Sequence, residues 1–222
     1  MDRTADAVII GGGIAGASVG HFLAKKKFGK IVVLEKRTLA AVGTGHSAAN
    51  IRTYYSNPVT VQLAKRALEM FENDRELLGG DCSFRQVGFL LLLDERSVDP
   101  GRQILELQKQ FGLDIKDVSP ADIKEIAPQI VLDHVARGIY EPRSGYTDPV
   151  RTTLNLIDKA KEWGLTCIER VGATRIRVAN DRVTAVETED GPISTSVVVN
   201  AAGPWGPRVG SWIGLKYSLR WS

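Results

Sequence analysis

The sequence lacks the patterns that indicate disulfide frameworks, metal centres and nucleic-acid interfaces. It has two cysteines and three widely spaced histidines in 222 residues, so neither a disulfide framework nor a metal site is expected. The net charge of +3, without a basic run interleaved with aromatic residues, gives no indication of nucleic-acid binding. No apolar stretch approaches the roughly 20 residues of a membrane span. Together these absences predict a cytoplasmic protein in a reducing compartment, with no transmembrane segment.

A glycine-rich turn between two short apolar segments is the most informative feature that the sequence does contain. Residues 7–10 read as a strand, residues 11–16 follow the pattern G-x-G-x-x-G, and residues 31–34 read as a second strand. This second strand ends at Glu35. The order of strand, glycine turn, helix, strand and acid predicts a βαβ unit that binds an adenine dinucleotide. A glycine-rich turn without a ligand is the less favoured alternative.

Each part of this unit has a mechanical role in the predicted site. Gly11 lets the chain turn sharply out of the strand, and Gly13 lets backbone N–H groups approach a pyrophosphate at the positive end of the helix. Gly16 lets that helix lie close to the sheet, and Glu35 can accept hydrogen bonds from both hydroxyls of a ribose. The predicted contacts within the turn are at Gly11, Gly13, Ile14, Ala15 and Gly16.

The rest of the chain shows helical and strand patterns in an order unlike that of a plain dinucleotide dehydrogenase. Residues 36–50 read as a loop that enters a short helix, and residues 58–78 have helical spacing. Ser119-Pro120 and Asp148-Pro149 each predict a helix N-terminus. The predicted strands are 87–93, 134–140, 165–169, 174–178, 182–188 and 194–200, with a strand-like segment at 215–221. This order predicts a second domain threaded through the nucleotide domain.

Three further stretches add a resemblance to one family. Residues 43–52 read Gly-Thr-Gly-His-Ser-Ala-Ala-Asn-Ile-Arg, residues 144–149 read Ser-Gly-Tyr-Thr-Asp-Pro, and residues 200–205 read Asn-Ala-Ala-Gly-Pro-Trp. With residues 8–35, these stretches make the chain similar to FAD-dependent amine and amino-acid oxidoreductases of the D-amino-acid oxidase, glycine oxidase and sarcosine oxidase type. Within this family the chain most resembles sarcosine oxidase β-subunits and proline dehydrogenase-like members.

The resemblance implies a fold and a domain organisation. The expected fold class is α/β, with a Rossmann-like, glutathione-reductase-like FAD-binding domain and an inserted mixed-sheet substrate domain that is incomplete at the C-terminus. The expected boundaries are 1–57, 148–180 and 194–215 for the FAD-binding domain, 58–79 for a connecting helix, and 80–147 with 216–222 for the partial substrate domain. Such a chain would leave a sheet edge unpaired, so a partner subunit or a homo-oligomer is expected.

FAD is the cofactor that the resemblance implies, and its flavin end needs a second segment besides the glycine turn. Short side chains in residues 43–49 would let backbone amides reach the flavin ring, although an ordinary loop would look similar. Ala173 is expected to contact adenine through its backbone. Lys36 and Arg37 could neutralise phosphate or form a solvated edge. The further predicted FAD contacts are Glu35, Lys36, Arg37, Thr44, Gly45, His46, Ser47, Ala48, Ala49, Ala173, Ala201, Ala202, Gly203 and Trp205.

Two residues are predicted to act in catalysis. His46 lies where some relatives attach the flavin covalently through histidine, and the alternative is a histidine that only hydrogen-bonds near the ring. Arg52 matches the arginine with which the family binds a substrate carboxylate, for which a planar guanidinium offers a bidentate clamp. The alternative is a structural or surface arginine.

The implied activity is the oxidation of a C–N bond in a secondary amine or amino acid, such as sarcosine, proline or glycine, by hydride transfer to FAD. Three alternatives stay open. The chain could be a non-catalytic flavin-binding assembly or chaperone-like protein, an inactive truncated fragment of such an enzyme, or an NAD(P)-binding domain. Glu35 disfavours a 2′-phosphate and therefore NADP.

Overall fold

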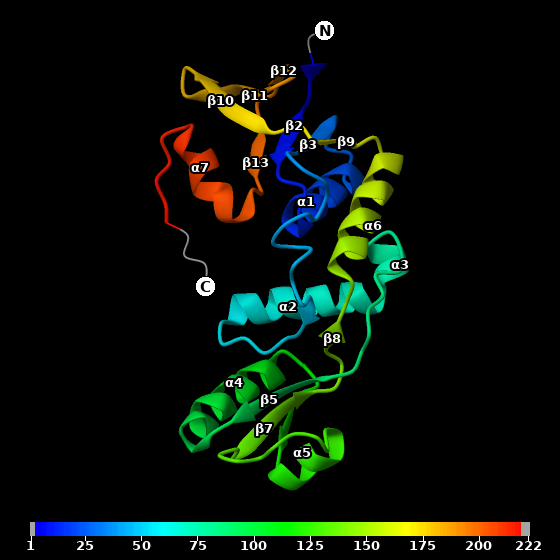
Figure 1. The fold of residues 1–222 in the computed structure, drawn as a ribbon, viewed down its shortest axis with the longest axis vertical. Coiled ribbons are helices and arrows are strands. Elements are labelled where there is room, and N and C mark those ends of the chain that lie inside the picture. Colours follow the sequence, from blue (N-terminus) through cyan, green and yellow to red (C-terminus); the bar gives the residue numbers. More distant parts are fainter. Residues whose placement is uncertain (1–2, 219–222) are drawn as a thin grey trace. The chain divides into compact units, whose positions relative to one another are not determined.

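The computed structural model describes residues 3–218 and divides the chain into two compact units (Figure 1). The first unit comprises Met1–Ala48, Leu78–Cys82 and Asp148–Ser222. The second unit comprises Ala49–Leu77 and Ser83–Thr147. Each unit is therefore assembled from stretches that are distant in the sequence, as a threaded arrangement requires.

The boundaries of these units differ in several places from the expected domain boundaries. The first unit ends its first stretch at Ala48, and most of the expected connecting helix belongs to the second unit. Residues 181–193 belong to the first unit. Residues 216–222 also belong to it, although 219–222 lie outside the described residues. What each unit binds stays a prediction.

A parallel sheet forms the centre of the first unit, with strand order β13-β2-β3-β9. Its strands are β2 (Ala7–Ile10), β3 (Ile31–Glu35), β9 (Thr166–Glu169) and β13 (Val198–Asn200). Residues 7–10 and 31–34 are fully buried, which explains why they read as continuous apolar runs rather than alternating patterns. Val8 pairs with Val32 on one side and with Val198 on the other, so β2 is an inner strand that lies between β3 and β13.

Helices cover one face of this sheet and a second sheet covers the other (Figure 1). The helices are α1 (Ile14–Lys25) and α6 (Pro149–Glu162), which pack on each other. The second sheet has the order β1-β12-β11-β10, with β1 (Arg3–Thr4), β10 (Ala173–Ala179), β11 (Arg182–Thr188) and β12 (Gly191–Ser194). Val8, Val32 and Val186 share a core between the two sheets. The short η2 (Gly203–Trp205) and α7 (Gly206–Ser211) follow β13.

The prediction of one strand over residues 194–200 is wrong. The chain leaves the outer sheet at Ser194, the last residue of β12, and enters the parallel sheet at Val198, the first residue of β13. Thr195 closes the turn between them, because its hydroxyl donates to Val197 O (3.1 Å) and accepts from Val197 N (3.3 Å). The side chain of Thr195 therefore stabilises the turn by which the chain passes from one sheet to the other.

The prediction of a short helix within residues 36–50 is also wrong, because this segment forms consecutive turns. Gly45 N donates to Ala40 O (2.8 Å), and Ala40 has a positive φ of 58°. A left-handed residue at this position prevents a regular helix. The strand-like segment at 215–221 has no strand at residues 215–218, and its remainder lies outside the described residues.

The second unit is built on a three-stranded antiparallel sheet with the order β5-β7-β6. Its strands are β5 (Phe89–Leu93), β6 (Lys116–Val118) and β7 (Arg137–Glu141). Its helices are α2 (Pro58–Glu72), α3 (Asp74–Leu77), the short η1 (Glu95–Ser97), α4 (Val98–Gln110) and α5 (Pro120–Ile126). A separate short pair joins β4 (Asn50–Ile51) to β8 (Gly145–Tyr146).

The predicted helix N-termini are confirmed. Ser119 and Asp122 form a reciprocal capping box at the start of α5. Asp148 accepts a hydrogen bond from Arg151 N at the start of α6. The helix expected over 58–78 is present as α2 and α3, which are separated at Asn73. In residues 3–218, no helix has both the length and the apolar character that crossing a membrane requires.

Candidate functional site

The glycine turn of the first unit is packed so closely that side chains cannot be added to it. A Cβ on Gly16 would lie 1.9 Å from Gly11 O, and a Cβ on Gly11 would lie 2.4 Å from Ala201 O. Gly11 also has a φ of 116°, a conformation that favours glycine. The structure thus brings three of the predicted FAD contacts together at the carboxyl ends of β2 and β13.

The N-terminus of α1 begins at this turn and has the properties of an anion site. Gly13 is the N-cap residue and supplies no side-chain acceptor, and the first turn contains no acidic residue. The positive end of the helix is therefore not neutralised by its own sequence. The Thr44 hydroxyl accepts a hydrogen bond from Ile14 N (3.0 Å), and a Cβ on Gly13 would lie 2.9 Å from that oxygen. Gly13, Ile14 and Thr44 thus meet at the helix N-terminus where the sequence predicts that a phosphate binds.

Glu35 ends β3 beside the same turn. One carboxylate oxygen accepts from Gly12 N and the other from Arg37 N, each at 2.8 Å. Two backbone N–H groups thus fix the carboxylate, and each oxygen keeps acceptor capacity for a ribose hydroxyl. Glu35 stands in the position that the βαβ pattern predicts for the ribose contact.

Lys36 and Trp205 come together across the end of the central strand. The Lys36 ammonium lies 4.1 Å from the centroid of the Trp205 ring. Lys36 follows β3 and Trp205 ends η2 after β13, while β2 lies between those two strands. The pair therefore connects the two strand ends that flank the glycine turn, and the arrangement is a cation–π contact.

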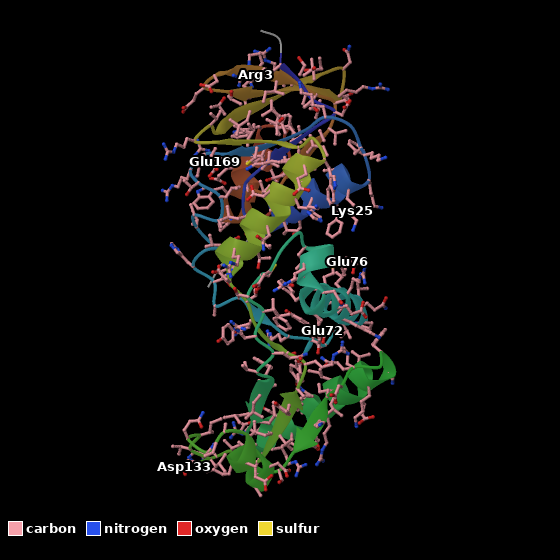
Figure 2. All side chains as sticks on the ribbon, turned by 90° about the vertical axis from the view of Figure 1, so that its right-hand side faces the viewer. Arg3, Lys25, Glu72, Glu76, Asp133 and Glu169 are labelled. Carbon is pink, nitrogen blue, oxygen red and sulfur yellow. The ribbon has the colours of Figure 1, made fainter. Side chains whose placement is uncertain are left out.

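Ala173 starts β10 and follows a segment that is tied to Glu35 and Arg37. Val171 N donates to Glu35 O (3.0 Å), and Arg170 N donates to Arg37 O (2.9 Å). Glu169, labelled in Figure 2, accepts a hydrogen bond from Leu39 N (2.8 Å). These contacts bring the half-buried Ala173 near the predicted ribose residue, so the structure gathers the predicted adenine side of the site.

The segment predicted to lie beneath the flavin is mostly exposed at its end. Residues 46–48 are exposed, Thr44 and Gly45 are half-buried, and Ala49 has a positive φ of 47°. His46 N donates to Val42 O (3.0 Å). His46 belongs to the first unit, whereas Arg52 belongs to the second. The covalent attachment of flavin at His46 stays a prediction.

Arg52 follows β4 in the second unit and lies beside two aromatic rings. Its guanidinium carbon lies 5.2 Å from the Tyr55 ring centroid and 5.4 Å from the Phe89 ring centroid. The residue is half-buried, and no carboxylate within residues 3–218 pairs with it. A half-buried guanidinium among aromatic faces and without an acidic partner can receive a carboxylate from a ligand.

Sequence reasoning missed a buried polar network next to Arg52. Glu141 is 1% exposed, and its Oε2 accepts hydrogen bonds from Thr53 N (2.8 Å) and from the Ser144 hydroxyl. Gln108, which is fully buried, donates to Thr53 O (2.8 Å). Burial and the charge of Glu141 raise the pKa of Tyr54. The available signal was an acid at the end of a strand, three positions before the Ser-Gly-Tyr-Thr-Asp-Pro stretch begins.

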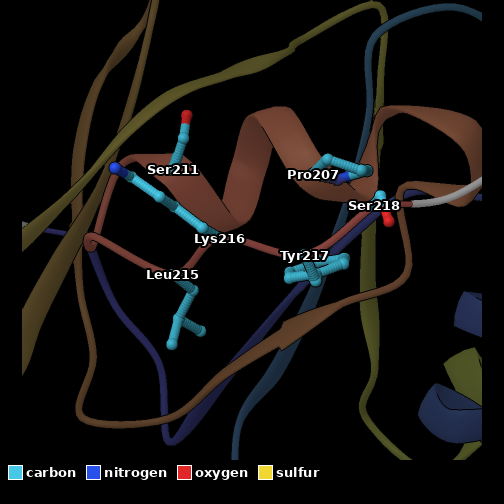
Figure 3. Close-up of a pocket in the computed structure, with 6 residues that line it drawn as sticks. All are labelled: Pro207, Ser211, Leu215, Lys216, Tyr217 and Ser218. Carbon is cyan, nitrogen blue, oxygen red and sulfur yellow. The ribbon is translucent and has the colours of Figure 1, made fainter.

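Two other features do not add chemistry to the site. Burial is the main cause that raises the pKa of the Cys167 thiol to about 11, so this cysteine is not a thiolate nucleophile at neutral pH. A pocket of about 450 Å³ lies against α7 and is lined by Pro207, Ser211, Leu215, Lys216, Tyr217 and Ser218 (Figure 3). The Tyr217 hydroxyl is engaged structurally, because it donates to Gly206 O (2.6 Å) and accepts from Asn200 Nδ2 (2.9 Å).

Comparisons with known proteins agree with this arrangement. The family profile DAO, described as FAD dependent oxidoreductase, matches residues 6–217. Mitochondrial sarcosine dehydrogenase from Mus musculus is 33% identical over 226 residues, which cover 99% of this chain and 25% of the relative. Mitochondrial dimethylglycine dehydrogenase from Homo sapiens is 31% identical over 222 residues, covering 97% of this chain and 25% of the relative.

A solved structure shows the same fold. L-proline dehydrogenase from P. horikoshii matches with a TM-score of 0.91 and 31% identity, over 99% of this chain and 58% of the matched chain. The chain thus spans about a quarter of the length of the two curated relatives and 58% of this structure. The expected α/β fold of the FAD-dependent amino-acid oxidoreductases and the expected cofactor, FAD, are confirmed. This chain belongs to the family of FAD-dependent oxidoreductases.

Proposed function

We propose that this chain carries the FAD-binding and carboxylate-binding parts of an oxidoreductase that oxidises the C–N bond of a small amino acid or N-methylated amino acid. The observation that carries the proposal is Arg52, a half-buried guanidinium beside two aromatic rings with no acidic partner in residues 3–218. A substrate carboxylate would supply the missing partner in a bidentate pair. The relatives named above act on sarcosine, dimethylglycine and proline by their names, and all three compounds carry a carboxylate and an amine.

The residues of the first unit would hold the cofactor. Gly13, Ile14 and Thr44 would bind the diphosphate at the N-terminus of α1. Glu35 would accept the ribose hydroxyls, since two backbone N–H groups already fix its carboxylate. When bound, FAD supplies the hydride acceptor. Arg52 would orient the substrate by its carboxylate, and the rings of Tyr55 and Phe89 would exclude water from that ion pair.

Binding of the cofactor and action on amines can be tested separately. The purified chain is expected to be yellow, and acid precipitation should release the chromophore unless His46 holds it covalently. A colourless chain would favour an NAD-type dinucleotide and overturn the proposal. Under anaerobic conditions, sarcosine, dimethylglycine or L-proline is expected to bleach the flavin absorbance. A flavin that no amine bleaches would instead support a non-catalytic flavin-binding protein.

The role of Arg52 requires a carboxylate-specific measurement. We compare sarcosine with dimethylamine, which has the same secondary amine but no carboxylate. Arg52→Met is expected to lower the preference for sarcosine about 100-fold, since loss of a charged hydrogen-bonded partner costs about 2–5 kcal/mol. Arg96→Met, at an exposed arginine of the same unit, is the matched control and should leave the preference unchanged. Equal preferences in wild type and Arg52→Met would refute this role.

Assembly and location belong to the same proposal. A partner subunit or a second copy of the chain is expected, and light scattering of the purified chain tests this. A cytoplasmic location is likewise proposed, and fractionation of the source cells tests it.

A further inference from the structure

Arg52 is held on both sides by one short loop that connects β7 to β8. On its N-terminal side, Ile51 pairs with Gly145 in the β4–β8 ladder. On its C-terminal side, Thr53 N donates to Glu141 Oε2 (2.8 Å). Glu141 and Gly145 are the two ends of this loop, so residues 141–145 fix the backbone before and after Arg52.

A second element, α4, fixes the backbone carbonyl of Thr53. Gln108 of α4 donates from Nε2 to Thr53 O (2.8 Å) and to Tyr55 O (3.3 Å). Both main-chain groups of Thr53 are therefore bound by buried side chains, because Glu141 takes its N–H and Gln108 takes its C=O. Thr53 itself is 2% exposed. These groups take part in no regular strand or helix, since β4 ends at Ile51 and Thr53 lies outside any element.

The same loop also positions one of the aromatic walls around Arg52. Gly88 N donates to Ser144 O (2.8 Å), and Gly88 has a positive φ of 82°. Phe89, the next residue, lies 5.4 Å from the Arg52 guanidinium carbon. The Ser144 hydroxyl meanwhile donates to Glu141. Residues 141–145 thus position both the Arg52 guanidinium and the Phe89 ring beside it.

The energetics of Glu141 favour a role in geometry over a role in stability. Its Oε1 is buried and has no hydrogen-bond partner among the described residues. Burial of a carboxylate with incomplete hydrogen bonding is costly. A neutral side chain could accept the Thr53 N–H at lower cost. The charged acceptor gives a shorter, more directional hydrogen bond.

We propose that Glu141 and Gln108 are positioning residues for Arg52. They clamp Thr53 so that the adjacent guanidinium is held beside the Tyr55 and Phe89 rings before a carboxylate arrives. The inference rests on the proposed function, since it assigns to these two residues the preorganisation of the carboxylate clamp. Neither residue touches the substrate; each acts through the backbone of Thr53.

The first experiment measures carboxylate preference, the ratio of the flavin-reduction efficiencies for sarcosine and dimethylamine. Glu141→Met and Gln108→Met are each expected to lower this ratio about tenfold, since displacement of a positioning group by about 1 Å can cost up to about 100-fold. Glu141→Gln keeps an oxygen acceptor for Thr53 N–H and should recover part of the loss. Gln110→Met, at an exposed glutamine two residues further along α4, is the matched control and should behave as wild type.

Double substitutions separate the failure of this inference from the failure of the proposed function. If Arg52 mediates the effect, adding Glu141→Met to Arg52→Met should not lower the ratio further. An unchanged ratio in Arg52→Met would refute the proposed function. The positioning role would be refuted if Arg52→Met lowers the ratio as expected while Glu141→Met and Gln108→Met keep the wild-type ratio. A purely structural role would lower both efficiencies and leave their ratio intact, which also refutes it.

The second experiment needs neither flavin reduction nor substrate. The Nε–Hε resonance of Arg52, assigned through Arg52→Lys, reports the order of the guanidinium in the whole chain. We expect a slowly exchanging, ordered signal in wild type and in Gln110→Met. In Glu141→Met and Gln108→Met the signal should broaden or shift toward that of a solvated arginine. An unchanged Arg52 signal in both variants would overturn the inference even if the chain proves to have no activity.

Discussion

The glycine turn of the first unit and the Arg52 segment of the second unit are shaped by opposite means. The turn is shaped by missing side chains, since a Cβ on Gly16 would lie 1.9 Å from a backbone oxygen. The Arg52 segment is shaped by side chains that are present, since Glu141 and Gln108 bind both polar groups of Thr53. The turn should therefore fail when atoms are added, and the segment should fail when polar atoms are removed.

Among the changes that test this comparison, the largest effect is expected where one methyl group is added to the turn. Gly16→Ala places Cβ against Gly11 O, and overpacking of about 1–3 kcal/mol should weaken FAD binding about tenfold or more. Bound FAD per chain and the affinity for added FAD are the measurements. Ala179→Val is the control, because it adds atoms at an exposed position of the same unit that is not among the predicted FAD contacts. Equal FAD binding by the two variants would remove one side of the comparison.

Removal of a polar group from the Arg52 segment should have the next largest effect. Gln108→Leu leaves the carbonyls of Thr53 and Tyr55 without their donor, which costs about 1–3 kcal/mol for buried polar groups. The free energy of unfolding from urea titration measures this loss. Gln110→Leu, at an exposed position of the same helix, should change it little. If Gln108→Leu is as stable as wild type, side chains do not shape this segment.

The pH dependence of stability tests whether burial and the charge of Glu141 act on Tyr54, the residue after Thr53 in this segment. Burial and the charge of Glu141 raise the pKa of Tyr54, so the folded chain holds this proton more tightly than the unfolded chain does. The resulting stability is fully present below the unfolded pKa of about 10 and is lost as pH rises through the folded pKa. Tyr54→Phe should therefore lose less stability than wild type above pH about 10.

Denaturation midpoints between neutral and strongly alkaline pH provide the measurement. Tyr146→Phe serves as the control, because Tyr146 is 48% exposed in the same unit and should reproduce the wild-type slope. Identical alkaline slopes in wild type and Tyr54→Phe would show that the environment of Tyr54 does not penalise its ionised form.

The smallest effect is expected at the contact between Lys36 and Trp205. Lys36→Met removes the ammonium that lies 4.1 Å from the ring, and such exposed contacts contribute about 0.5–1 kcal/mol. We expect a small loss of stability and a change in tryptophan fluorescence, with Lys26→Met as the exposed control. Unchanged fluorescence in Lys36→Met would mean that the two strand ends are not joined in solution.

The sequence was sufficient to predict the parts of the fold that depend on local patterns. The buried runs of β2 and β3, the glycine turn and the caps at Ser119 and Asp148 follow from short-range chemistry. The family and its cofactor followed from motifs of the same short range. The individual FAD contacts and the catalytic roles of His46 and Arg52 stay predictions.

Features that depend on long-range contacts could not be predicted in the same way. Thr53 meets Glu141 across 88 residues and Gln108 across 55, and no pattern near Thr53 announces either partner. The break between β12 and β13 depends on one hydroxyl, that of Thr195, within an otherwise strand-like sequence. The turns at 40–47 depend on a left-handed alanine, which composition does not reveal.

The three-residue link between β12 and β13 has a consequence for how homologous chains can vary in length. It carries the chain from one sheet to the other, and β13 leads directly to Ala201, whose oxygen lies against Gly11. One extra residue in the link would have to loop out from it, or β13 would shift by one residue against β2 and its side chains would change faces. Insertions among related chains should therefore accumulate in the hairpin between β10 and β11, while the link keeps a constant number of residues.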